Sequence, residues 1–139
     1  SIPAPSELLG RLSEIERAAD QERAKIPAHI TVKGTFYYIP SLDGILDRIR
    51  AVASRHDPFV LSTDGMEFIG PDHSVILGFT VNPEIQAVHD DLVTNIAPLS
   101  KLVYRDDPYR AHMSVVNEVE PEGVEIAKSM IAISILAMV

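Results

Sequence analysis

"PAHITVKGTF", residues 27–36, has the alternation of a β-strand. Side chains of a strand point alternately to its two faces, so His29, Thr31 and Lys33 share one face and Ile30 lies on the other. The apolar face is expected to pack against helices. The polar face must meet water or a ligand, because a buried polar group without a partner costs about 1–3 kcal/mol.

"RAHMSVVNEV", residues 110–119, repeats this pattern in the second half of the chain. His112, Ser114 and Val116 are expected on one strand face, and Met113 on the other. Two predicted strands therefore each present a histidine and, two residues later, a hydroxyl on the same side.

A doubled pair of histidine and hydroxyl suits chemistry on a phosphodiester. An imidazole has an unperturbed pKa of about 6.5, so one ring can take a proton while the other donates one near neutral pH. A hydroxyl can donate a hydrogen bond to a phosphate oxygen and stabilise its developing charge. The alternative interpretation is that both histidines are satisfied core groups with no chemical role.

The pattern along the rest of the chain predicts an α+β fold in which helices and strands alternate irregularly. Helices are expected over residues 5–24, 41–55, 83–97 and 121–130. Strands are expected over residues 28–36, 74–81, 112–119 and 131–138. Residues 59–70 are expected to form two short strands with a turn at Asp64 and Gly65, and residues 98–111 a loop. The length of 139 residues suits a single domain over residues 1–139.

Composition excludes several classes of partner and site. The net charge of −8 opposes binding to long nucleic acids, which depends on many Lys and Arg contacts to phosphates. With no Cys there is no disulfide, thiolate nucleophile or Cys-ligated zinc, which fits a cytoplasmic protein. The apolar residues 130–139 are fewer than the roughly 20 that span a bilayer, so no membrane contact is expected.

"HITV", residues 29–32, and "HMSV", residues 112–115, resemble the paired H-x-[ST]-x motifs of the 2H phosphoesterase superfamily. The nearest branch is the 2'-5' RNA ligase-like and 2',3'-cyclic phosphodiesterase group, and the resemblance covers residues 5–138. It implies a two-lobed, pseudo-twofold domain with antiparallel sheets flanked by helices and a central cleft that carries both motifs. The family usually begins with a strand before the first helix, which in this chain is absent, trimmed or very short, and Ala111 stands where a Pro often precedes the second histidine.

The resemblance also implies roles for the four motif residues. His29 and His112 become the general acid and base, and Thr31 and Ser114 bind the phosphate, with no metal and no other cofactor. The implied partner is a small nucleotide or an RNA end with a cyclic phosphate or a 2'-5' linkage.

Several neighbours of the motifs are candidates for substrate binding. Lys33 and Arg110 could add local positive charge, or could be surface charges at strand ends. Tyr38, Tyr104 and Tyr109 could stack on a base, or could cover loop edges.

The remaining histidines, His56, His73 and His89, lack a hydroxyl two residues later and are expected to be surface or structural groups. His89 falls in the predicted helix 83–97, whose buried face is expected to hold Ile85, Val88, Leu92 and Ile96. A metal site made by His89 with the two following aspartates is disfavoured, because adjacent helical residues point in different directions.

Three functions follow from these features. The first is a metal-independent phosphodiesterase that acts on 2',3'-cyclic phosphate or 2'-5' phosphodiester bonds. The second is a non-catalytic module that binds a nucleotide or RNA end in the same cleft. The third is a metal-dependent hydrolase that uses both histidines as ligands, although no carboxylate cluster accompanies them.

Overall fold

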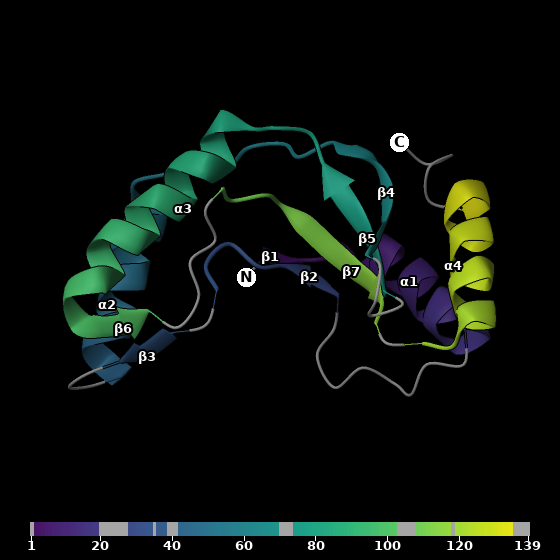
Figure 1. Ribbon diagram of the computed structural model, residues 1–139. Coiled ribbons are helices and arrows are strands. Elements are labelled where there is room, and N and C mark those ends of the chain that lie inside the picture. The colour runs from purple at the N-terminus through teal and green to yellow at the C-terminus, as the bar shows by residue number, and fades with distance from the viewer. Residues whose placement is uncertain are drawn as a thin grey trace. The chain divides into compact units, whose positions relative to one another are not determined.

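A computed structural model (Figure 1) describes residues 2–19, 28–34, 36–38, 42–69, 74–102, 108–117 and 119–134. The chain divides into two compact units. Unit one comprises Ser1–Thr31, Ser62–Thr80 and Ala111–Val139, and unit two comprises Val32–Leu61 and Val81–Arg110. Helices and antiparallel strands are mixed along the chain, which confirms the predicted α+β class.

Unit one is built on a five-stranded sheet in which all neighbouring strands are antiparallel. In spatial order the strands are β1 (Ile2–Pro3), β2 (His29–Ile30), β7 (His112–Val116), β5 (Ser74–Phe79) and β4 (Thr63–Ile69). Strand β5, "SVILGF", is an almost continuous apolar run with neighbours on both sides, and residues 74–78 are buried. The two motif strands, β2 and β7, lie side by side in this sheet.

Two helices of unit one pack on the sheet and on each other, α1 (Ser6–Ala18) and α4 (Pro121–Ser134) (Figure 1). Their buried side chains recur at helical spacing: Leu12 and Ile15 in α1, and Val124, Ala127 and Ile131 in α4. Gly123 allows the close approach, because a Cβ atom at this position would lie 2.5 Å from the carbonyl oxygen of Ala19.

Unit two contains helices α2 (Leu42–Ser54) and α3 (Pro83–Ile96), which pack together. Asn82 caps α3, since its side-chain oxygen accepts a hydrogen bond of 2.8 Å from the backbone N–H of Ile85. After α3 the chain makes a short 3₁₀ turn, Ala97–Leu99, and enters strand β6 (Ser100–Leu102), which pairs with β3 (Phe36–Tyr38).

Several details of the predicted elements are wrong. The strand expected over residues 28–36 is interrupted by a bend at residues 32–33, so its two ends form β2 and β3 in different sheets. The turn expected at Asp64 and Gly65 is a β-bulge inside β4, where Thr63 pairs with Phe79 and Gly65 with Gly78. Gly65 has a φ of 120°, which a residue with a side chain rarely adopts. The loop expected over residues 98–111 contains strand β6, and residues 103–107 lie outside the described residues.

The strand expected over residues 131–138 is also wrong where the chain is described, because α4 continues to Ser134. The helical spacing of the buried residues Val124, Ala127 and Ile131 carries the helix past the predicted end at residue 130. Residues 135–139 lie outside the described residues. No helix in the described ranges has the length and apolar character needed to cross a membrane.

Candidate active site

Strand pairing brings the two motifs side by side in the sheet of unit one. Ile30 of β2 pairs directly with Met113 of β7 in antiparallel register. Continued by one residue in each direction, this register would set His29 opposite Ser114 and Thr31 opposite His112. Directly opposed side chains of an antiparallel pair project from the same face, so two histidines and two hydroxyls form the corners of a small quadrilateral.

The spacing within this quadrilateral follows from strand geometry. Direct cross-strand partners have Cβ atoms about 4.5–5.5 Å apart, and diagonal neighbours are about 7–8 Å apart. The two histidines occupy one diagonal and the two hydroxyl residues the other. Two imidazoles on a diagonal of this length can both reach a group the size of a phosphate.

Burial confirms which face carries the motif residues. Thr31 and His112 are exposed, and His29 and Ser114 are half-buried. The residues between them, Ile30, Met113 and Val115, are buried at 3%, 2% and 1% exposure. The expectation of one polar and one apolar face therefore holds for both motifs, and the apolar face packs toward α1 and α4.

A β-bulge ends the polar face of β7 after Ser114. Ile76 of β5 pairs with Ser114, but Val75 pairs with Val116, so Val115 is the additional residue. The expectation that Val116 continues the face of His112 and Ser114 is wrong for this reason, and Val116 is fully buried.

The next strands extend the same face away from the motifs. His112 pairs with Gly78 of β5, which pairs with Gly65 of β4. The Thr63 hydroxyl stabilises the pairing of β4 with β5 at this position. It donates a hydrogen bond to the Gly78 carbonyl at 2.9 Å and accepts one from the Gly65 N–H at 3.2 Å. The register of β5 beside His112 is thus held by a side chain as well as by the ladder.

A carboxylate also lies on this face. Ser114 pairs with Ile76, and Ile76 pairs with Glu67 of β4, so half-buried Glu67 lies two strands from Ser114 on the same side. No motif in the sequence singles out Glu67, because its position depends on a pairing that the sequence does not reveal.

The other predicted site residues belong to unit two. Lys33 donates to the carbonyl of Gly34 at 3.0 Å, and Arg110 is exposed. Lys33 follows the bend after β2, so strand alternation no longer places it on the face of His29. Tyr38 lies in β3 opposite Ser100, and Tyr104 lies outside the described residues. Tyr109 stacks on His89, with ring centroids 4.3 Å apart and an interplanar angle of 12°.

His89 is the clearest departure from the expected helix faces. Ile85 and Ile96 are buried as predicted, but Val88 and Leu92 are only half-buried, and His89 takes the position between them at 5% exposure. Its Nδ1 lies 2.7 Å from the carbonyl oxygen of Val32. The helical spacing from Ile85 to His89 is the sequence signal that could have revealed this burial.

A second polar cluster joins α2 to α3 in unit two. Arg55 donates two hydrogen bonds to the carboxylate of Asp91, at 2.8 and 3.2 Å, and His56 Nε2 donates a third at 2.9 Å. The hydrogen bonds from Arg55, followed by that from His56, lower the pKa of Asp91. His56 therefore has a structural partner, as expected for a histidine outside the motifs, whereas His73 lies outside the described residues.

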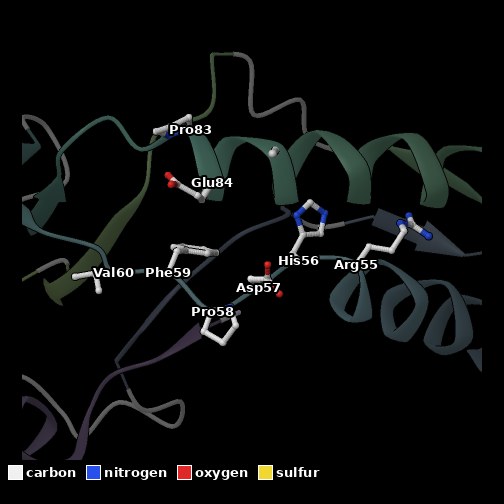
Figure 2. Close-up of a pocket in the computed structure, with 9 residues that line it drawn as sticks. Arg55, His56, Asp57, Pro58, Phe59, Val60, Pro83 and Glu84 are labelled. Carbon is white, nitrogen blue, oxygen red and sulfur yellow. The ribbon is translucent and has the colours of Figure 1, made fainter.

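Unit two also has a surface pocket of about 610 Å³ (Figure 2). It lies between the chain after α2 and the first turns of α3, and its lining comes from residues 55–60, 83, 84 and 87. Arg55 and His56 are already engaged by Asp91, and Asp57 and Glu84 add negative charge. This lining does not include the motif residues and does not present a site for a phosphate. Among the described residues, no three His, Asp or Glu side chains are grouped in a way that could hold a metal ion.

Comparison with known proteins identifies one family. The family model of the 2'-5' RNA ligase superfamily matches residues 4–135. No curated protein and no solved structure matches the chain.

Proposed function

The chain belongs to the 2'-5' RNA ligase superfamily, within the 2H phosphoesterases, and we propose that it is a metal-independent phosphodiesterase. The proposed bonds are 2',3'-cyclic phosphates or 2'-5' phosphodiesters of RNA ends or small nucleotides. The observation that supports this proposal is the antiparallel pairing of Ile30 with Met113, a register that would set His29 opposite Ser114 and Thr31 opposite His112.

In the proposed reaction the two histidines act as general acid and base. One imidazole takes a proton from water as the water oxygen bonds to phosphorus. The other gives a proton to the ribose oxygen whose bond to phosphorus breaks. One water is consumed, and a cyclic phosphate becomes a phosphate monoester.

Thr31 and Ser114 have the complementary role in this proposal. Their hydroxyls donate hydrogen bonds to the non-bridging phosphate oxygens, where negative charge accumulates in the transition state. The register would put these two residues on the diagonal that crosses the diagonal of the histidines, so their hydroxyls could reach the phosphate without displacing either imidazole.

The proposed substrates are short or small. A chain with a net charge of −8 repels an extended phosphate backbone, whereas a single phosphate needs only the local hydrogen bonds of the motif face. The two-lobed, pseudo-twofold arrangement with a central cleft remains a prediction. Both motif strands belong to the five-stranded sheet of unit one.

The test is turnover of a 2',3'-cyclic nucleotide, with and without a chelator, by the wild type and by His29→Ala and His112→Ala. Each substitution is expected to lower kcat by about 10²–10⁴-fold, the usual contribution of a positioned acid or base, and the chelator is expected to have no effect. His56→Gln is the matched control. It changes a histidine of unit two that is hydrogen-bonded to Asp91 and lies outside both motifs, so it should keep full activity.

Two results would overturn the proposal. Full activity of either alanine variant would remove the acid–base roles. Tight binding of a nucleoside 2'-monophosphate without any turnover of cyclic nucleotides would instead indicate the non-catalytic binding module.

A further inference from the structure

His89 is a buried imidazole outside the motif face. It lies on α3 at 5% exposure, and on the buried side of this helix its neighbours one turn before and two turns after are Ile85 and Ile96. A polar group in such surroundings is unfavourable unless it has a hydrogen-bond partner. The partners of His89 therefore show why a histidine occupies a position that suits an apolar side chain.

The first partner is the carbonyl oxygen of Val32, 2.7 Å from His89 Nδ1. A carbonyl oxygen only accepts hydrogen bonds, so Nδ1 carries the proton and donates it. Val32 is the last residue of the first motif and is bonded directly to Thr31.

The second partner is the ring of Tyr109, which stacks on the imidazole at a centroid distance of 4.3 Å. Tyr109 stands three positions before His112. One side chain thus contacts the segment that leaves the first motif and the segment that enters the second.

The strand pairing gives a reason for such a link. Strand β2 has two residues and meets β7 at a single register position, Ile30 opposite Met113. A shift of one residue in an antiparallel pair turns every side chain to the other face, so a short ladder specifies its register weakly. A fixed spacing between Val32 and Tyr109 opposes such a shift through the chain itself.

We propose that His89 is a positioning residue, which holds the two motif segments in the register that sets His29 and Thr31 against Ser114 and His112. The inference rests on the proposed function for its kinetic consequence, but its structural consequence is independent of any substrate. His89 contacts no reacting atom. It acts through Val32 and Tyr109.

The kinetic test compares two variants that each keep one of the two contacts of His89. His89→Phe keeps an aromatic ring for Tyr109 but loses the donor to Val32. His89→Asn keeps an N–H close to the position of Nδ1 but loses the ring. We expect His89→Phe to lower kcat by roughly 10- to 100-fold, as small misplacements of catalytic groups do, with KM changed much less. We expect His89→Asn to recover part of this loss.

A stability control separates positioning from simple destabilisation. Ile96→Ala removes a buried side chain from the same helix and should lower Tm while kcat is retained. Wild-type kcat in folded His89→Phe, or equal losses of kcat in the Phe and Asn variants, would overturn the inference. If His89→Phe does not fold, Tyr109→Leu and Tyr109→Phe replace it. The leucine variant should lose more kcat than the phenylalanine variant, which keeps an aromatic ring against His89, and equal kcat in both would overturn the inference.

A readout without substrate distinguishes failure of this inference from failure of the proposed function. Amide hydrogen exchange of Thr31 and Ser114, whose N–H groups the antiparallel alternation directs across the β2–β7 pair, should become faster in His89→Phe than in Ile96→Ala at equal distance below Tm, as followed by NMR. Unchanged exchange at both amides would contradict the role of His89 even in a protein that turns over cyclic nucleotides. If the wild type turns over none, faster exchange still supports the link while the proposed function fails.

Discussion

Ile30 and Met113 face each other across two neighbouring antiparallel strands, and both side chains are buried beneath the sheet. This one pairing gives the two H-x-[ST]-x motifs a common geometry. Because Ile30 and Met113 point inward, we expect the residues on either side of them to point outward, with each histidine opposite the hydroxyl residue of the other motif.

The buried side chains of this strand pair are predicted to matter for stability. Met113→Ala should lower the free energy of unfolding by about 2–5 kcal/mol, because Met113 is 2% exposed and its removal leaves a cavity. Val81→Ala is the control, since Val81 is 95% exposed and surface substitutions usually stay within about 0.5 kcal/mol. Chemical denaturation of both variants measures the difference, and equal stabilities would contradict the burial of Met113.

The exposed side chains of the same strand pair are predicted to matter for catalysis. Thr31→Val keeps the shape of the side chain and removes its hydroxyl, so kcat/KM for a 2',3'-cyclic nucleotide should fall roughly 10- to 150-fold, the worth of one hydrogen bond to a charged group. Thr31→Ser retains the hydroxyl and should stay close to the wild type. Thr31 is exposed, so Tm should hardly change in either variant. Equal activity of the valine and serine variants would exclude a phosphate contact by Thr31.

Two glycines in helices of unit one are predicted to respond in opposite directions to alanine. A Cβ atom on Gly123 would meet the carbonyl oxygen of Ala19 at 2.5 Å, so Gly123→Ala should destabilise by about 1–3 kcal/mol through overpacking of α4 against α1. A Cβ atom on Gly10 would meet no atom within 4 Å, so Gly10→Ala should stabilise α1 by up to about 1 kcal/mol. Thermal unfolding measures both, and a stabilising Gly123→Ala would contradict the close packing of the two helices.

The ion pair between α2 and α3 is predicted to give a pH-dependent contribution. The hydrogen bonds from Arg55 and His56 lower the pKa of Asp91 below its ordinary value of 3.8. A carboxyl with a lowered pKa in the folded state stabilises the fold above its unfolded-state pKa, and this contribution is lost as the pH falls through the folded-state pKa. The Tm difference between wild type and Asp91→Asn should therefore shrink as the pH falls below 3.8.

The size of this effect should also depend on salt. Arg55 has a side chain that is 48% exposed, and ion pairs at the surface are screened. Added salt should reduce the Tm difference at neutral pH. A Tm difference that stays unchanged from neutral pH to about pH 2 would contradict an ionised Asp91 in the pair.

The sequence predicts elements well where a local pattern is strong. The spacing of apolar residues places α3 almost correctly, and the alternation of His29, Ile30 and Thr31 agrees with the burial of the first motif. Alternation shows which residues share a face of one strand. It does not show that β2 is the neighbour of β7, nor that Ile30 meets Met113, because these are properties of the folded sheet.

The errors have similar physical causes. Asp64 and Gly65 have the residues of a hairpin turn, yet the ladder to β5 continues around them as a bulge. An apolar run such as residues 131–138 suits a strand or a buried helix equally well, and its first residue, Ile131, is buried as part of α4. Histidine is a polar residue that is usually found at the surface. The burial of His89 is favourable only because of its tertiary partners, Val32 and Tyr109.

The most direct test of the central claim is a crystal structure of the protein bound to a nucleoside 2'-monophosphate. We predict that the phosphate lies between the imidazoles of His29 and His112, with Thr31 Oγ1 and Ser114 Oγ donating hydrogen bonds to its oxygens. A phosphate bound elsewhere, or one that touches only one of the two histidines, would contradict this prediction.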